Sequence, residues 1–194
     1  QVKLEKSTKE RREGAIAIRI AKLCHDINEE GLLAVDQRIV VVLLALEFCK
    51  SGNGTVTDLE RGFIATLAES LNISNEEYDI IEKFVLNPFT EIPSSQNLLV
   101  ISGTRTDATG NTKYAFRDQL KGQIWILYVP SVNMYFLRHA RSGELSMNGL
   151  LLKENKVYPI SHGSSIKGYN ISPIYHWDIT MLFLKEEFRS SRVV

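Results

Sequence analysis

The sequence predicts an α+β protein in which an all-α helical bundle over residues 1–88 precedes a β-sandwich over residues 97–185. Two distributions along the chain support this prediction. All five prolines lie at or after position 88, and 13 of the 17 aromatic residues lie in the same half. A proline-free half followed by a half rich in aromatic residues is typical of helices followed by strands. We place the boundary between residues 87 and 96, where Asn-Pro and Ile-Pro-Ser-Ser interrupt the chain.

Composition and charge limit the function classes. The 194 residues, 44% of them hydrophobic, suffice for one large or two small cores. Residues 1–88 hold 11 Lys and Arg against 15 Asp and Glu, a net charge of −4, whereas residues 89–194 hold 12 against 8, a net charge of +4. We expect that the two halves attract each other or that the second half faces an anionic surface. Because the basic residues are scattered, we expect no nucleic-acid binding.

No run of apolar residues reaches the roughly 18–20 residues of a membrane-spanning helix. No apolar segment follows the charged N-terminus either, so we expect neither a membrane span nor a signal peptide in this sequence. The chain begins with Gln1, and its first methionine is Met134. We therefore expect it to be part of a longer polypeptide.

Two long helices are predicted at the start of the bundle. The first covers residues 7–28, where apolar residues recur at helical spacing. The second covers residues 35–50, and its apolar run from 39 to 46 indicates the central helix of the bundle. The sequence Ser-Gly-Asn-Gly at 51–54 suits the C-cap and turn that follow it.

Two capping boxes predict the starts of a third and a fourth helix. Thr57 precedes Glu60 by three residues, and Ser74 precedes Glu77 by the same spacing. In a capping box the hydroxyl and the carboxylate each accept a hydrogen bond from a backbone N–H group that the helix leaves without a partner. Both helices should therefore begin directly after the hydroxyl residue.

The loop before Glu60 resembles the second part of an EF-hand loop. We do not expect calcium binding, because Cys49 and Lys50 occupy the first two loop positions, where the site needs an Asp ligand. Cys49 and Cys24 both lie in apolar segments with helical patterns. We expect two buried, reduced thiols.

The second half has the pattern of short strands separated by turns. Glycine-bearing turns are predicted at residues 108–111, 141–143 and 162–163, at spacings typical of an all-β sandwich. The predicted strands cover residues 98–102, 113–116, 123–129, 134–139, 149–152, 157–160 and 165–167.

The motifs of common enzyme and metal sites are missing from the sequence. It contains no Gly-Lys-Ser/Thr for phosphate binding and no Gly-x-Ser-x-Gly nucleophile motif. The four histidines lack zinc-ligand spacing. Asp178 follows an aromatic strand end, where a turn or capping role is favoured over a general base. We expect no catalytic, cofactor or metal site in this sequence.

Residues 14–86 resemble the TerB-like helical family of tellurite-resistance proteins. The matching pattern is Gly-x-Val-Thr-x-x-Glu at 54–60, Phe63-Ile64 on the next helix, and Leu-Asn-Ile-Ser-Asn-Glu-Glu at 71–77. In that family the turn often carries an Asp-Gly pair that has been linked to metal binding. Asn53-Gly54 occupies those positions here.

The order of strand, Asn148-Gly149, two apolar strands and Gly-Ser-Ser-Ile-Lys-Gly at 163–168 resembles the second half of a forkhead-associated domain. That family is a sandwich that usually binds phosphothreonine, and its Asn-Gly turn supports the recognition loops. The Gly-Arg and Ser-x-x-His motifs that grip the phosphate do not precede Asn148 here. Phosphopeptide binding therefore stays as the alternative function, and it would depend on Arg138 or Arg141.

Nearly the whole chain is similar to the cytoplasmic region that precedes the nucleotide-binding cassette in a group of large bacterial ATP-binding-cassette transporter proteins. The stretches responsible are 120–136, 144–150, 163–166 and 174–178, with Tyr158. The resemblance implies a TerB-like segment followed by a forkhead-associated-like segment. It also implies a location at the inner face of the cytoplasmic membrane through the parent protein, with neighbouring domains of that protein as partners.

From these observations we expect a non-catalytic regulatory or scaffolding region that acts by docking. For the aromatic cluster Tyr169, Tyr175, His176 and Trp177 core packing is favoured, and a patch that faces a partner or a membrane is the alternative, because Trp and Tyr prefer half-wet interfaces. A homodimer is also possible, given the amphipathic first helix. The predicted interaction surface consists of Arg138, Arg141, Asn148, Gly149, Tyr169, Tyr175 and Trp177.

Overall fold

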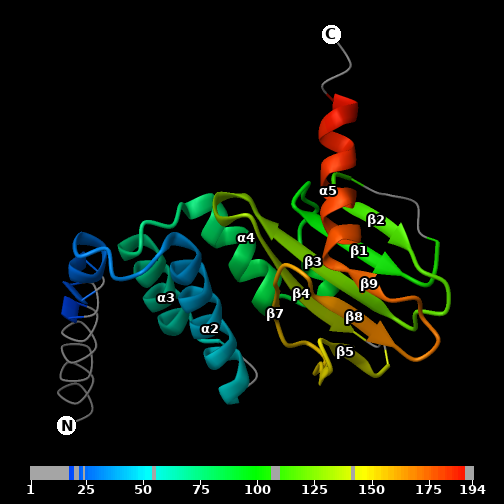
Figure 1. The fold of residues 1–194 in the computed structure, drawn as a ribbon. Coiled ribbons are helices and arrows are strands. Elements are labelled where there is room, and N and C mark those ends of the chain that lie inside the picture. Colours follow the sequence, from blue (N-terminus) through cyan, green and yellow to red (C-terminus); the bar gives the residue numbers. More distant parts are fainter. Residues whose placement is uncertain are drawn as a thin grey trace. The chain divides into compact units, whose positions relative to one another are not determined.

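Helices and strands occupy different parts of the chain. The computed structural model describes residues 18–19, 22–23, 25–53, 56–105, 110–140 and 143–190. The chain divides into two compact units, residues 1–90 and 91–194, named here the helical unit and the sheet unit. Figure 1 shows that the second unit contains strands and one helix at its C-terminal end. The protein is therefore of mixed α+β class.

The helical unit is organised around α2, which contacts both of the helices that follow it. Ile39, Val42 and Leu46 of α2 are fully buried, and their spacing places them on one face. The helix predicted over residues 7–28 lies largely outside the described residues, although residues 25–29 are helical. The helices are α2 (Val35–Asn53), α3 (Asp58–Ser70) and α4 (Asn75–Leu86), and the short η1 (Phe89–Glu91) follows them.

α2 differs in two ways from the predicted central helix over residues 35–50. It continues to Asn53, and the Ser51 hydroxyl supports its last turn by donating to the carbonyl oxygen of Phe48 at 2.8 Å. Only one face of α2 is buried, because Val41, Leu44 and Phe48 are exposed. The apolar run that indicated a central helix is therefore shared between a core face and a surface.

The predicted caps start α3 and α4. The backbone N–H of Thr57 donates to Glu60 Oε2 at 2.8 Å, and the N–H of Glu60 donates to Thr57 Oγ1 at 3.3 Å, which confirms this capping box. The Thr57 hydroxyl also donates to Glu60 Oε2 at 2.8 Å, and the two bonds that this carboxylate accepts from the backbone N–H and the hydroxyl of Thr57 lower the pKa of Glu60. The N–H of Glu77 donates to Ser74 Oγ at 3.2 Å, which confirms Ser74 as the N-cap of α4. A hydroxyl cap of this kind stabilises a helix by about 1 kcal/mol.

The sheet unit contains two sheets. The first sheet has the strand order β2-β1-β3-β4-β7, and the second sheet has the order β6-β5-β8-β9. β1 and β2 pair in parallel, and the other neighbours pair antiparallel. The strands are β1 (Leu98–Ser102), β2 (Lys113–Phe116), β3 (Gln123–Val129), β4 (Met134–Ala140), β5 (Leu145–Met147), β6 (Leu150–Leu151), β7 (Tyr158–Ile160), β8 (Ser165–Gly168) and β9 (Ile174–Tyr175), and η2 (Pro130–Val132) lies between β3 and β4.

The predicted strands are present, and none of their ends differs by more than one residue from the prediction. The prediction missed β5, β9 and a C-terminal helix, α5 (His176–Ser190). The two missed strands have three and two residues, so neither is long enough to show a clear alternation of apolar and polar residues.

One hydrophobic core lies between the two sheets. The first sheet contributes alternate residues of β1, β3 and β4, such as Leu99, Ile126 and Leu137. The second sheet contributes Ile166 and Ile174, which face each other across β8 and β9. The core therefore joins strands that are far apart in the sequence, and the opposite face of the second sheet points away from this core.

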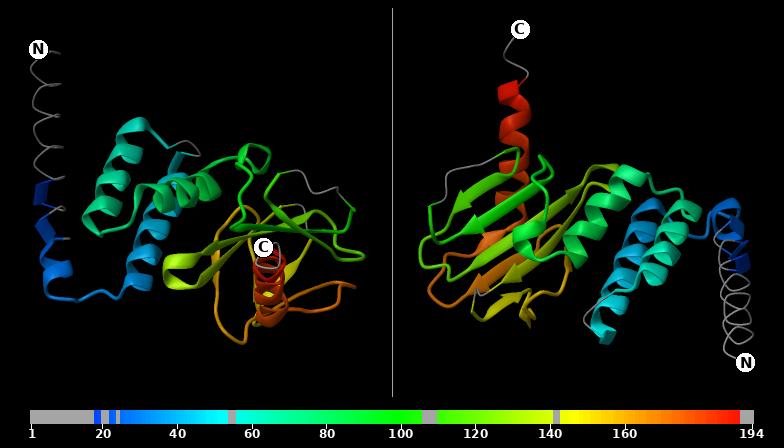
Figure 2. Two further views of the ribbon diagram at one scale, coloured as in Figure 1. Left: turned by 90° about the horizontal axis from the view of Figure 1, so that it is seen from above. Right: turned by 180° about the vertical axis from the view of Figure 1, so that it is seen from behind.

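α5 completes this core, and its presence corrects the prediction of a sandwich made of strands alone. Ile179 and Phe183, four residues apart on one helix face, are buried among the core residues. The Phe183 ring lies 5.4 Å from that of Tyr128 and 5.5 Å from that of Tyr135, measured between centroids. α5 contacts the edge strands β2 and β9, one from each sheet, and Figure 2 shows it end-on between them. A helix thus closes one side of the two-sheet core.

Within the described ranges, none of the helices has both the length and the apolar character needed to cross a membrane.

Candidate docking surface on the second sheet

The outer face of the second sheet is defined by strand alternation. Leu151, Ser146 and Lys167 are paired across β6, β5 and β8, so their side chains form one row. Ser146 alternates with the core residue Leu145, which places this row on the face opposite the core. The pairing of Leu145 with Gly168 continues to Glu144 and Tyr169, which form a second row on the same face.

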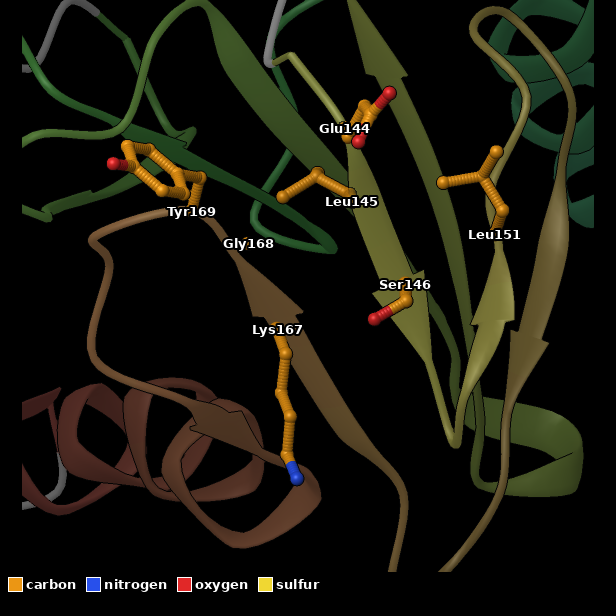
Figure 3. Close-up of a pocket in the computed structure, with 7 residues that line it drawn as sticks. All are labelled: Glu144, Leu145, Ser146, Leu151, Lys167, Gly168 and Tyr169. Atoms are coloured by element: carbon orange, nitrogen blue, oxygen red, sulfur yellow. The ribbon is translucent and has the colours of Figure 1, made fainter.

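A groove of about 330 Å³ lies on this face. Figure 3 shows its walls: Leu151 and Tyr169 lie on opposite sides, and Glu144 and Lys167 lie at opposite ends. The groove therefore has apolar side walls, formed by Leu151 and Tyr169, and a charged residue at each end, Glu144 at one and Lys167 at the other. Its lining consists of Glu144, Leu145, Ser146, Leu151, Lys167, Gly168 and Tyr169.

The three aromatic residues of the predicted interaction surface are exposed. The exposed fractions are 87% for Tyr169, 51% for Tyr175 and 66% for Trp177. Tyr175 pairs with Ser165 of β8, so it lies on the outer face with Tyr169, and Trp177 follows in the first turn of α5. Because all three side chains are exposed, the prediction that they pack in the core is wrong.

Asn148 and Gly149 form the tight turn between β5 and β6. Both have positive φ angles, 53° and 84°, as the central residues of a type I′ hairpin turn require. The Asn148 side chain donates to Ser164 Oγ at 3.2 Å and accepts from the N–H of Ser165 at 3.0 Å. Asn148 therefore ties this turn to the start of β8.

The two arginines of the predicted surface are placed differently from the aromatic residues. Arg138 of β4 is only 2% exposed, and its Nη2 donates to Asn155 Oδ1 at 3.1 Å. Arg141 lies outside the described residues. The prediction that Arg138 belongs to the exposed interaction surface is therefore wrong, because its side chain is buried.

His176 lies between the exposed aromatic residues and the core. Its ring packs against that of His162, with centroids 5.2 Å apart, and against that of Tyr135 at 5.5 Å. Its backbone N–H donates to the carbonyl oxygen of Ser164 at 2.9 Å, which holds the start of α5 against the turn before β8. Burial and the neighbouring His162 lower the pKa of His176.

Asp178 has the capping role that the sequence favoured. Its Oδ2 accepts from the backbone N–H of Tyr175 at 3.0 Å, one residue before the helix begins. The same oxygen lies 3.6 Å from Arg117 Nη2. This ion pair is partly exposed, so it contributes at most about 1 kcal/mol.

Of the residues considered for metal binding, the structure describes Glu60 and Cys49. Glu60 is engaged in its capping box, and part of the loop before it lies outside the described residues. Cys49 is partly buried, and burial followed by the charge of Glu60 raises the pKa of its thiol. Cys24 lies outside the described residues. Across the residues described, no group of three or more His, Cys, Asp or Glu is placed to hold a metal ion.

Sequence reasoning missed the groove, although it identified one of its walls. Glu144, Ser146 and Leu151 received no role, because β5 was not recognised as a strand. The alternation Glu-Leu-Ser-Met over 144–147 is the signal that could have revealed β5, and with it the outward direction of Glu144.

Comparisons with known proteins give no relative: no family model matches the chain, and no curated protein and no solved structure matches it either.

Proposed function

We propose that this chain is a non-catalytic regulatory or scaffolding region of an ATP-binding-cassette transport protein, and that it acts by docking. The observation that carries the proposal is the exposure of Tyr169, Tyr175 and Trp177 on and beside the outer face of the second sheet. Aromatic residues are enriched in protein interfaces, where a few of them supply most of the binding free energy.

Several features support docking through this face. The inner face of the sheet rests on a packed core, so the backbone that carries the outer side chains is ordered before a partner arrives. Leu150 and Leu151 of β6 are 75% and 66% exposed, which adds apolar surface on this sheet. A partner that covers these side chains gains free energy by removing them from water.

The proposed parent protein rests on sequence resemblance. The stretches 120–136 and 174–178 are similar to the cytoplasmic region that precedes a nucleotide-binding cassette. In this proposal the helical unit is TerB-like and the sheet unit is forkhead-associated-like, and both act at the inner face of the bacterial cytoplasmic membrane. Docking of the sheet unit on a neighbouring domain favours one of that domain's conformations.

The continuation of the reading frame beyond residue 194 gives the first test. The proposal expects a cassette there, with the phosphate-binding Gly-x-x-x-x-Gly-Lys-Ser/Thr motif. Binding of that purified cassette to residues 1–194 can then be measured by calorimetry. Replacing Trp177 and Tyr175 by alanine should weaken binding by about tenfold or more, because buried interface aromatics are binding hot spots.

A matched control is Phe48→Ala, which removes an aromatic side chain that is 79% exposed in the helical unit. This variant should bind the cassette with unchanged affinity. A cassette that does not bind the wild-type chain, or that binds the Trp177→Ala and Phe48→Ala variants equally well, would reject docking of the cassette on the outer face.

A second candidate function is phosphopeptide binding, which the bonds from Asn148 to Ser164 and Ser165 favour. In forkhead-associated domains the Asn-Gly turn supports the recognition loops, and these bonds support the proposal of the same role for Asn148. A phosphothreonine peptide array tests this candidate. It requires binding that collapses in Arg138→Ala or Arg141→Ala, and an array without such a peptide rejects it.

A further inference from the structure

The groove on the outer face of the second sheet presents two opposite charges. Glu144 lies beside Tyr169, and Lys167 lies beside Ser146, so Glu144 and Lys167 are diagonal neighbours on β5 and β8. Such diagonal neighbours lie about 7–8 Å apart, and the distance between their Cβ atoms is somewhat smaller. In Figure 3 the Lys167 side chain extends away from Glu144. Among the described residues, neither of them forms an ion pair, so both charges are available to a ligand.

The other diagonal of the groove is apolar. Leu151 and Tyr169 lie on opposite sides, and both are largely exposed. The Ser146 side chain is partly buried and lies between Leu151 and Lys167, in the middle of their row. A ligand that lies across this groove therefore meets an anionic group, a cationic group and two apolar walls within a few residues' length.

We propose that this groove binds an extended peptide segment of a partner protein in which a basic and an acidic residue are two positions apart and an apolar residue is nearby. Alternate side chains of an extended segment point to the same side and lie about 6.8 Å apart. This spacing matches the diagonal, so the basic residue meets Glu144 and the acidic residue meets Lys167. The apolar residue then packs against Leu151 or Tyr169.

This inference rests on the proposed function, because it names the kind of segment that the docking surface accepts. Glu144 and Lys167 determine which spacing of basic and acidic residues the groove accepts. They add little to the affinity, because ion pairs between exposed side chains contribute little free energy. An isolated peptide should therefore bind weakly, with a dissociation constant on the order of 1 mM. Tight docking would need the aromatic residues as well.

The test uses two synthetic peptides with the same composition. One carries arginine and glutamate two positions apart, followed by leucine two positions later, with serine at the other positions. In the other, arginine and glutamate are adjacent, so that their side chains point to opposite sides. Chemical-shift changes of the ¹⁵N-labelled chain should map the first peptide to Ser146, Lys167 and Tyr169, and the second should bind at least about fivefold more weakly.

Charge exchange makes the test specific. Glu144→Lys and Lys167→Glu should each reduce binding of the first peptide by about fivefold, because two like charges then face the basic or the acidic residue. The double variant should restore binding, since the segment can lie in the reverse direction. Lys121→Glu is the matched control, because Lys121 is exposed in the turn before β3 and does not line the groove.

Three results would overturn the inference: no shift changes at the groove residues, equal binding of the two peptides, or a double variant that binds no better than the single variants. The failure of the groove and the failure of the docking function can be told apart. If the cassette binds through Trp177 and the peptides do not bind, only the groove inference fails. If the peptides bind at the groove and the cassette does not bind, only the proposed partner fails.

Discussion

The helical unit and the sheet unit are specified over different distances along the chain. In the helical unit, α3 begins because Thr57 and Glu60, three residues apart, exchange hydrogen bonds. In the sheet unit, Leu99 of β1 and Phe183 of α5 belong to the same core although 84 residues separate them. The start of a helix is therefore set locally, whereas the sheet core depends on the last helix reaching the first strand.

This difference bears on function as well as on stability. The outer face of the second sheet is ordered only when its inner face is packed, because β5, β6 and β9 have no more than three residues each. The proposed docking surface therefore depends on long-range packing. Damage to the core should disturb this surface, whereas damage to a helix cap should not.

The largest expected effect comes from Phe183→Ala. This change removes an aromatic ring that packs against Tyr128 and Tyr135, and should lower the free energy of unfolding by about 3–5 kcal/mol. Both tryptophans of the chain, Trp125 and Trp177, lie in the sheet unit, so denaturant unfolding followed by tryptophan fluorescence reports on this unit.

Leu184→Ala is the control for this experiment. Leu184 follows Phe183 on α5 but is 38% exposed, so its loss should cost clearly less. If Phe183→Ala lowers the unfolding free energy by less than about 1 kcal/mol, α5 does not complete the core and the comparison between the units breaks down.

A smaller effect is expected for Thr57→Ala in the helical unit. It removes the hydroxyl that accepts from the N–H of Glu60 and should cost about 1 kcal/mol. Circular dichroism at 222 nm should show an earlier loss of helix, while tryptophan fluorescence of the sheet unit stays unchanged.

Thr66→Ala is the matched control within α3. The Thr66 hydroxyl donates to the carbonyl oxygen of Gly62, which is already used in the helix, so its loss should change the stability little. A shift of the fluorescence transition in Thr57→Ala would contradict the local character of this cap.

The smallest effect is a difference in acid sensitivity between the units. Burial lowers the pKa of His139 and of His176 below the ordinary value of 6.5, and His162 lowers that of His176 further. Their neutral forms are therefore favoured in the folded state. As the pH falls below about 6.5, the unfolded chain takes up protons first, and the sheet unit loses stability until the folded pKa values are passed.

Glu60 gives the helical unit a lower window. Its folded pKa is lowered from the ordinary value of 4.5, so its contribution is present above that pH and is lost as the pH falls through the folded pKa.

The histidine effect can be measured by thermal melting followed by tryptophan fluorescence. As the pH is lowered from 7.5 to about 5, the transition temperature of the sheet unit should fall, and this fall should be smaller in His176→Gln. An equal response in wild type and variant would exclude His176 as a cause.

The sequence predicted more of the strands than of the site. Long strands such as Gln123–Val129 have enough residues to show their pattern, and their ends were predicted correctly. The site needs β5 and β9, which are too short to show one, and α5, which the sequence analysis did not predict. The burial of Arg138 could not be predicted from the neighbouring sequence either, because its hydrogen-bond partner Asn155 lies 17 positions away.

The sequence by itself determined the local features: the caps at Thr57 and Ser74, and the turn at Asn148-Gly149. Each depends on hydrogen bonds or φ angles within a few residues, so the residue types suffice. Only the tertiary structure decided which residues share a surface. Glu144 and Lys167 lie on the same face because β5 pairs with β8, and this pairing is held by a core that residues throughout the sheet unit build together.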